Sequence, residues 1–167
     1  MSGSERFTFF WGGPFSQWHK CAFTVDGVAY SSAEQYMMAQ KATLFGDEAA
    51  CARIMATRDP RKQKAIGRTV AGFNAARWEA AAQEAVYRAN RAKFTADRDL
   101  LAQLLATRGT TLVEASPSDT IWGIGLAADD PAALDRATWR GTNLLGDILT
   151  RLRDELAGAG PDVAGPR

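Results

Sequence analysis

Residues 31–41, SSAEQYMMAQK, combine the signals of a helix start with two side chains that can carry chemistry. The two serines are candidate N-caps, because a serine hydroxyl accepts a hydrogen bond from a backbone N–H of the first helical turn. In the predicted helix, Glu34 and Lys41 lie on one stripe with Met37 and Met38 between them. A carboxylate and an amine therefore share one helix face, about 10 Å apart along the axis.

This face has two interpretations. Ser31 and Glu34 have the spacing of a capping box, in which Glu34 would accept a hydrogen bond from the backbone N–H of Ser31 and take no part in chemistry, while Lys41 would be an ordinary solvated lysine. Alternatively, the two charged side chains serve a ligand, since two helical turns are about as long as a small sugar phosphate. The remainder of the chain is needed to decide between them.

Length and composition favour one globular domain. The chain has 167 residues, of which 46% are hydrophobic, enough for a packed core. Basic and acidic residues number 20 and 19, so the net charge is +1. This balance argues against binding long nucleic acid through phosphate neutralisation alone, and it leaves nucleic acid as a partner only through a local site.

Cysteine and histidine content limits the chemistry. Cys21 and Cys51 lack the spacing of a metal site or a disulfide framework, and with no signal peptide or long apolar run they indicate free thiols in a reducing cytoplasm. His19 is the one histidine, which excludes a multi-histidine metal site. We expect a cytoplasmic protein that needs no metal or other cofactor and has no membrane segment.

Turn residues and hydrophobic patterning predict the order of elements. The expected elements are a strand at 7–11, a hairpin at 21–30 turning at Asp26-Gly27, and a helix from Ser31. Further helices are expected at 47–56 with Asp47 as cap, from Asp59-Pro60, at 75–94 with Asn74 as cap, and from Asp97 or Asp99. A strand at 110–115 and a last helix from Thr142 or Asn143 to about Leu156 complete the order. Strands and helices do not alternate regularly, so we predict an α+β class, a mainly helical single domain with a small β-sheet. Residues 1–6 and 157–167 are expected to be a flexible start and a disordered tail around a domain at 7–156.

A basic cluster surrounds the helix expected after Asp59. It consists of Arg58, Arg61, Lys62, Lys64 and Arg68. Such a cluster is usually a solvated face, but it could also meet a phosphate.

Six separated motifs together resemble the NADAR family, the YbiA-like proteins. They are FTFFWGGPFSQW, VDGVAYSSAEQYMMAQKATLFGD, DPRKQKAIGR, AKF, LVEASPSDTIWGIGL and WRGTNLLGDIL, spread over roughly Phe7 to Leu156. The resemblance implies an N-glycosidase fold and activity. Members of the family cleave the bond between ribose and a nitrogenous base in early pyrimidine intermediates of riboflavin synthesis, and other members remove ADP-ribose from guanine in nucleic acid.

The resemblance also implies site residues. The family's acidic residue and lysine of the EQY helix fall on Glu34 and Lys41, and the aspartate of its SPxDxxWGxG signature falls on Asp119. These three are the expected catalytic residues. The expected substrate-binding residues are Phe15, Ser16, Trp18, Trp78, Trp122 and Gly123. The loop at 15–18 departs from the family pattern, because this chain has Gln17-Trp18 where many relatives have Asn-Phe.

Cleavage of an N-glycosidic bond builds positive charge on the ribose and negative charge on the leaving base. Glu34 is expected on the ribose side, as general base for water or as electrostatic partner, and Asp119 as a second carboxyl or as a group orienting a ribose hydroxyl. Lys41 allows a more specific, covalent mechanism. If its amine is desolvated, it could attack C1 of a ring-opened ribose and form a Schiff base, which water then hydrolyses. Trp78 and Trp122 would stack on the base.

Structural explanations compete with these roles. In Ser-Pro-Ser-Asp, Asp119 fits a turn that its own carboxylate forms with the backbone. Gly123 fits a simple packing position, and Asn143 fits an N-cap.

Three functions follow. The leading hypothesis is a hydrolase of ribosylaminopyrimidine phosphates. The second is an ADP-ribosyl-guanine hydrolase acting on nucleic acid, as an antitoxin does. The third is an ADP-ribose-binding module without turnover, which the presence of both Glu34 and Lys41 disfavours because binding alone needs no reactive pair.

Overall fold

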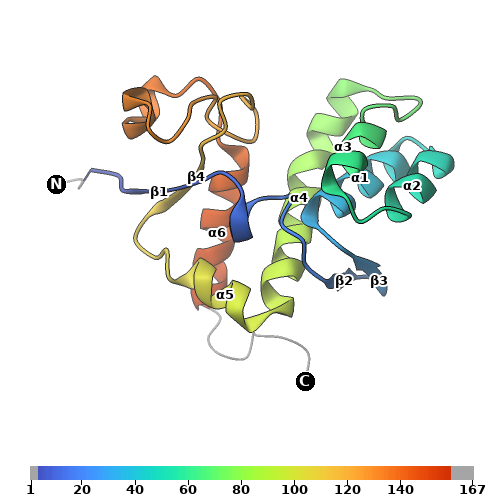
Figure 1. Cartoon of the computed structure of the whole chain (residues 1–167), viewed down its shortest axis with the longest axis horizontal. Helices are drawn as coiled ribbons and strands as arrows, with labels where there is room; N and C mark the ends of the chain where they lie inside the picture. Colours follow the sequence, from blue (N-terminus) through green and yellow to red (C-terminus); the bar gives the residue numbers. More distant parts are fainter. Residues whose placement is uncertain (1–3, 159–167) are drawn as a thin grey trace. The chain divides into compact units, whose positions relative to one another are not determined.

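The computed structural model describes residues 4–158, and their contacts divide into two compact units (Figure 1). Residues 4–16 and 98–158 build the first unit, and residues 17–97 build the second. Both units combine short strands with helices. The predicted mainly helical α+β class is confirmed, with two small sheets of two strands each.

A hairpin opens the second unit. Strands β2 (Phe23–Val25) and β3 (Val28–Tyr30) pair in antiparallel fashion. Asp26 and Gly27 have φ angles of 51° and 80°. Positive φ at both central residues is typical of the two-residue hairpin turn, so the turn predicted from Asp-Gly is confirmed.

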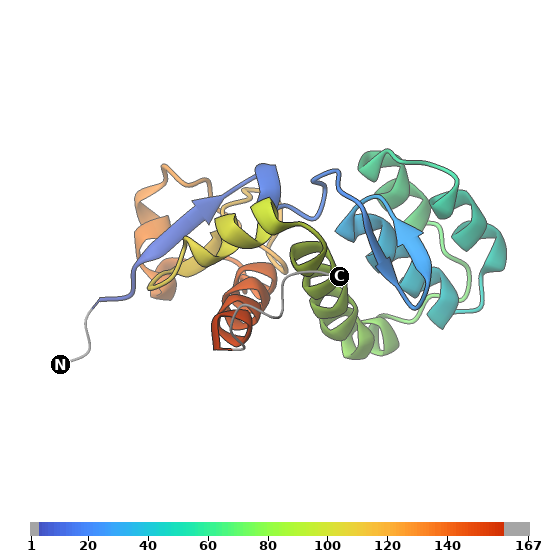
Figure 2. The ribbon, with the colours of Figure 1, turned by 90° about the horizontal axis from the view of Figure 1, so that it is seen from below.

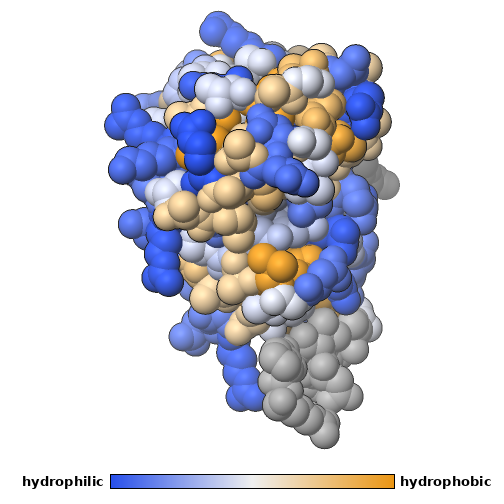
Figure 3. Space-filling view, turned by 90° about the vertical axis from the view of Figure 1, so that its right-hand side faces the viewer, coloured by the Kyte–Doolittle hydropathy of each residue, from blue (hydrophilic) through white to orange (hydrophobic). Residues whose placement is uncertain are grey.

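Four helices form the rest of the second unit. They are α1 (Ala33–Leu44), α2 (Glu48–Met55), α3 (Pro60–Gly67) and α4 (Ala75–Ala96). Helix α1 contacts each of the other three and also β3, as Figure 2 shows. Most of its residues are buried, which makes it the central helix of this unit. The face of the unit seen in Figure 3 is mostly hydrophilic, with apolar patches between polar side chains.

Each of these helices begins at a polar residue whose side chain accepts a backbone hydrogen bond. The capping residues are Ser32, Asp47, Asp59 and Asn74. Such caps satisfy N–H groups that have no partner within the helix. The starts at Asp47, Asp59 and Asn74 were predicted from the sequence and are confirmed, and at α1 the cap is Ser32, the second of the two candidate serines.

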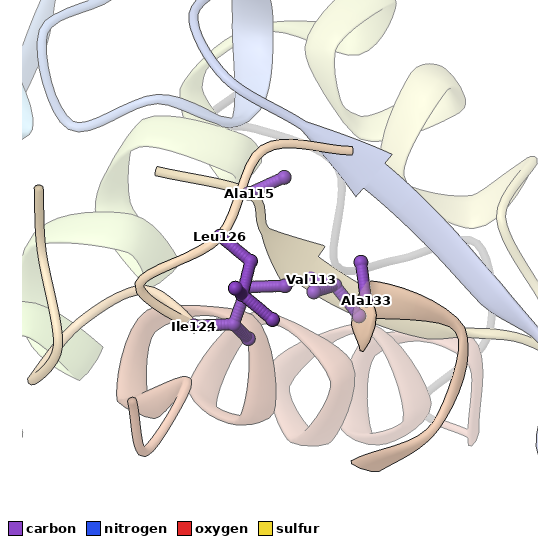
Figure 4. Packing of buried hydrophobic residues seen from close by; sticks show 5 residues of the cluster. All are labelled: Val113, Ala115, Ile124, Leu126 and Ala133. Carbon is purple, nitrogen blue, oxygen red and sulfur yellow. The ribbon is translucent and has the colours of Figure 1, made fainter. Parts of the chain in front are cut away.

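The first unit contains the parallel pair of strands β1 (Phe7–Phe10) and β4 (Thr111–Glu114). Its helical elements are η1 (Gly13–Phe15), α5 (Arg98–Leu105), η2 (Pro131–Leu134), η3 (Arg136–Thr138) and α6 (Leu144–Gly158). Helix α6 packs against β4. A buried cluster lies beside them, formed by Val113, Ala115, Ile124, Leu126 and Ala133 (Figure 4).

The contacts between α6 and β4 differ from the predicted role of Asn143 as a side-chain N-cap. Asn143 directly precedes α6, but its amide binds the strand: Oδ1 accepts a hydrogen bond from Glu114 N–H at 3.0 Å, and Nδ2 donates to Leu112 C=O at 3.0 Å. The expected capping side chain therefore holds the helix against the strand. Gly146 allows this approach, because a Cβ there would overlap the Leu112 carbonyl oxygen.

The two chain ends were predicted to be flexible or disordered. The Glu5 carboxylate accepts hydrogen bonds from Arg136 and Thr111, so ordered structure begins before Phe7. At the other end α6 extends to Gly158, and residues 159–167 of the predicted tail lie outside the described residues. None of the helices within residues 4–158 has the length and apolar character needed to cross a membrane.

Candidate active site

The first turn of α1 shows which residues cap this helix. Ser32 Oγ accepts a hydrogen bond from Gln35 N–H at 3.0 Å, and Gln35 Oε1 accepts one from Ser31 N–H at 2.7 Å. The capping contacts therefore use Ser32 and Gln35, one position later than the predicted pair of Ser31 and Glu34. The interpretation of Glu34 as a capping-box residue is wrong.

Buried glutamines hold the start of α1 in place. Gln35 Nε2 donates hydrogen bonds to the carbonyls of Ile54 and Thr57, each at 3.1 Å. Gln63 Oε1 on α3 accepts a hydrogen bond from Ser32 Oγ at 2.8 Å. These contacts join the first turn of α1 to the end of α2 and to α3. Glu34 therefore sits on a turn whose orientation is fixed from two sides.

The Glu34 side chain lies in a protected environment, with only 6% of the residue exposed. Its backbone N–H donates to the Gln17 carbonyl at 3.0 Å, and Gln17 Oε1 in turn accepts a hydrogen bond from Asn90 Nδ2 at 2.7 Å. The position in the first turn of α1 favours a negative charge through the helix dipole. A buried carboxylate in such a place interacts strongly with any charge that develops near it.

Lys41 lies between aromatic rings. Its Nζ is 4.7 Å from the ring centroid of Phe73 and 5.9 Å from that of Trp78. Burial lowers the pKa of the Lys41 amine, the Glu34 carboxylate opposes this shift, and the Arg68 guanidinium adds to it. A lower pKa increases the fraction of neutral amine, which is the nucleophilic form.

The sequence pattern did not single out Phe73. Half of this residue is exposed, and its ring also packs edge-on against Phe45 at 5.5 Å. The available signal was its place directly before the cap Asn74. Phe73 and Trp78 occupy the N′ and N4 positions of α4, where a hydrophobic staple places apolar residues.

Trp18, a predicted substrate-binding residue, is 42% exposed. Lys64 Nζ lies over its ring at 5.8 Å from the centroid. The contact joins the loop after Gln17 to α3. The second unit therefore brings Glu34, Lys41 and Trp78 together and connects Trp18 to the neighbouring basic helix.

Asp119 and Gly123 lie in the first unit. Asp119 Oδ1 accepts hydrogen bonds from the N–H groups of Ile121 and Trp122, at 2.9 and 2.8 Å. A Cβ on Gly123 would come within 2.8 Å of the Glu114 carbonyl oxygen and 3.0 Å of the Asp119 carbonyl oxygen. Turn formation and close packing thus account for these two residues, and their catalytic and binding roles stay predictions.

The other predicted residues of the first unit are Phe15, Ser16 and Trp122. The Phe15 ring packs edge-on against Phe10 at 5.8 Å. Ser16 N–H donates to the Gly13 carbonyl and ends η1. Trp122 is half-buried in the loop that Asp119 organises. Their contact with a substrate stays a prediction.

A hollow of about 230 Å³ between α1 and α2 has mostly apolar walls, and none of the predicted site residues lines it. Across the described part of the chain, histidine, cysteine and carboxylate side chains form no group of three or more that could hold a metal ion.

A buried glutamate and a partly buried lysine thus lie on one face of α1, the lysine beside the exposed Phe73 ring and the half-buried Trp78 ring, and their catalytic roles stay predictions. The family model of the NADAR domain matches residues 9–157 of this chain. The chain therefore belongs to the NADAR family.

Individual relatives agree with this assignment. N-glycosidase R617 of Acanthamoeba polyphaga mimivirus is 44% identical over 146 residues, 84% of this chain and 86% of that protein. N-glycosidase YbiA of Escherichia coli K12 is 32% identical over 145 residues, 87% of this chain and 82% of that protein. The NMR structure of E. coli YbiA superposes with a TM-score of 0.77 at 29% identity, covering 95% of this chain and 89% of that one.

A plant relative adds a metabolic context. The chloroplastic riboflavin biosynthesis protein PYRR of Zea mays is 36% identical over 115 residues, which are 66% of this chain but only 17% of the maize protein. Taken with the two N-glycosidases, the relatives identify the chain, at the level of its family, as an N-glycosidase, a hydrolase of N-glycosyl compounds.

Proposed function

We propose that the protein hydrolyses the bond between ribose and the base amine of ribosylaminopyrimidine phosphates, the early intermediates of riboflavin biosynthesis. The observation that carries this proposal is the pair of Glu34 and Lys41 on one face of α1, with the carboxylate buried and the amine desolvated beside two aromatic rings. The similarity to maize PYRR supports the choice of substrate class.

Glu34 acts on the ribose side of the scissile bond. As the bond to the base weakens, positive charge accumulates on the ribose, and a carboxylate in a low-dielectric environment stabilises that charge. The same carboxylate accepts a proton from the attacking water. The helix start that carries Glu34 is held by hydrogen bonds to α2 and α3, so little reorganisation is required.

Lys41 offers a covalent route. In a ribosylamine, the nitrogen lone pair expels the ring oxygen and leaves a C1=N iminium. Neutral Lys41 adds its nitrogen to C1, and the base amine departs with a proton, so that a Schiff base joins C1 to Nζ. Water then adds to C1 and releases the sugar phosphate as an aldehyde, which restores the amine.

Aromatic rings hold the flat base. Trp78 and the exposed Phe73 flank the Lys41 amine, and a heteroaromatic ring stacks well on such faces. A module that only binds ADP-ribose needs no desolvated amine, which weighs against the non-catalytic alternative.

The decisive experiment measures base release by chromatography from a ribosylaminopyrimidine phosphate and from DNA carrying ADP-ribosylated guanine. We expect release from the first substrate, and a fall in turnover of about 10²- to 10⁴-fold in Glu34→Gln, which keeps the size of the side chain but removes its charge. Release from the modified DNA alone would replace the proposal with the ADP-ribosyl-guanine hydrolase. No release from either substrate, or full activity of Glu34→Gln, would contradict the catalytic assignment.

A further inference from the structure

The basic cluster around α3 has two members that share a face. Lys64 is in the last turn of α3 and Arg68 is its C-cap, four residues later, so the two side chains are neighbours on the helix surface. Lys62 points to a different side of the helix and is exposed. Within the basic cluster, Lys64 and Arg68 therefore form a pair on one helix face, and Lys62 lies on another.

Acidic partners do not neutralise this pair. Among residues 4–158, the ion pairs involve Arg88, Arg136, Arg151 and Arg153, and none includes Lys64 or Arg68. The nearby Asp59 carboxylate accepts the backbone N–H of Arg61 and caps α3. Two like charges four residues apart repel each other. A helix C-terminus favours cations, and Lys64 also gains a cation–π contact with the Trp18 ring.

The packing of α3 on α1 brings the pair to the candidate active site. A Cβ on Gly67 would overlap Met38 Sδ, so the end of α3 lies directly against α1. Met38 is on the same stripe as Glu34 and Lys41. Arg68 follows Gly67 directly, so it is attached to the end of α3 that packs on α1, and its positive charge lowers the pKa of the Lys41 amine.

Trp18 connects the other member of the pair with substrate binding. Lys64 Nζ lies 5.8 Å from the centroid of this ring, and Trp18 was expected to contact the substrate. Arg68, at the end of α3 that packs on α1, and Lys64, over Trp18, thus add two positive charges on the side of α3 that carries these contacts.

We propose that Lys64 and Arg68 bind the phosphate ester carried by the ribose of the substrate. A phosphate group has several acceptor oxygens, which suit the forked guanidinium of arginine and the point charge of lysine. This role rests on the proposed function for the identity of the substrate. The shared ligand chemistry is a ribose phosphate ester, present in ribosylamine 5-phosphates and in ADP-ribose alike.

Titration calorimetry tests the site without any turnover. Ribose 5-phosphate, ADP-ribose and unphosphorylated ribose are titrated into the wild type, Lys64→Gln and Arg68→Gln, with Lys62→Gln as matched control. We expect each site variant to weaken binding of ribose 5-phosphate about tenfold or more, with Lys62→Gln within about twofold of the wild type. Arg68→Lys should recover part of the affinity, because it keeps the charge.

The two phosphate ligands distinguish the source of the ester. A loss for ribose 5-phosphate supports a monoester, and a loss confined to ADP-ribose supports the same site filled by a diphosphate. Unchanged affinity for both ligands in variants with wild-type melting temperatures would overturn the proposal, as would a wild type that binds neither ligand.

Kinetics then separate this proposal from the proposed function. With an active enzyme, Lys64→Gln should raise KM for the phosphorylated substrate about tenfold with little change in kcat. If the wild type cleaves neither test substrate but binds ribose 5-phosphate through Lys64 and Arg68, the reaction is wrong and the phosphate site stands. If cleavage occurs and these variants keep wild-type KM, the phosphate site is wrong and the reaction stands.

Discussion

The first turns of α1 and the loop at 119–123 both matched family motifs, but the structure explains them differently. In α1 the capping contacts use Ser32 and Gln35, and the buried Glu34 carboxylate acts electrostatically on the partly buried Lys41 amine. In the loop, the Asp119 carboxylate accepts backbone N–H groups, and Gly123 fits where a side chain cannot. The same family resemblance thus covers a buried carboxylate near an amine in α1 and a carboxylate that forms a turn in the loop.

The largest expected effect concerns Lys41. If this amine forms a Schiff base, Lys41→Arg should lower kcat about 10⁴-fold or more while binding of ribose 5-phosphate stays near the wild-type value, because arginine keeps the charge but is not a nucleophile. Borohydride added during turnover should leave a sugar phosphate covalently attached to the wild type and none on the variant, as mass spectrometry can detect. Near-normal turnover of Lys41→Arg would remove the covalent route.

Gly123→Ala tests the packing explanation in the loop. Its Cβ would press on two backbone carbonyl oxygens, which cannot move aside as a flexible side chain can. We expect a loss of about 1–3 kcal/mol in the free energy of unfolding, measured by urea denaturation. Gly67→Ala is the matched control, because the atom in the way there is the sulfur of the flexible Met38 side chain. Equal losses at the two positions would argue against backbone crowding at Gly123.

Asp119 allows turn formation and catalysis to be separated. Asp119→Ala removes the acceptor of two backbone N–H groups and should cost about 1–2 kcal/mol of stability, whereas Asp119→Asn keeps an oxygen at that place and should be nearly neutral. The catalytic role implied by the resemblance requires Asp119→Asn to lose activity at full stability. If Asp119→Asn has wild-type turnover, Asp119 has no catalytic role and serves only to form the turn.

The smallest expected effect is a shift in pH dependence. If neutral Lys41 is the nucleophile, kcat rises with pH as this amine loses its proton. Arg68 lowers the pKa of Lys41, so Arg68→Gln should raise that pKa and move the rising limb of the profile to higher pH. The profile is measured at saturating substrate, so that weaker binding does not contribute. A shift to lower pH would contradict the assigned coupling.

Local sequence chemistry predicted the boundaries of the elements well. The Asp26-Gly27 turn and the caps at Asp47, Asp59 and Asn74 all occur as expected, because each depends on residues within one turn of the chain. The same locality explains the error at α1. Ser31 and Ser32 were both suitable caps, and distant partners decided the choice, since Ser32 binds Gln63 of α3.

Other features depended on distant parts of the chain and left little trace in the sequence. The parallel pairing of β1 with β4 joins strands about a hundred residues apart. The Asn143 amide binds the backbone of β4 at two points, in addition to its contact with Asp147 of α6. Lys93 belongs to the AKF motif, yet only its packing shows that it is 1% exposed, with burial lowering its pKa to about 8.

The sequence by itself determined the family, the α+β class and the pairing of Glu34 with Lys41 on one helix face, because motifs and helical periodicity are properties of neighbouring residues. Only the tertiary structure decided which side chains became buried and which polar groups found partners. Those outcomes set the electrostatic environment of Lys41, since the rings of Phe73 and Trp78 and the charge of Arg68 reach it from other elements.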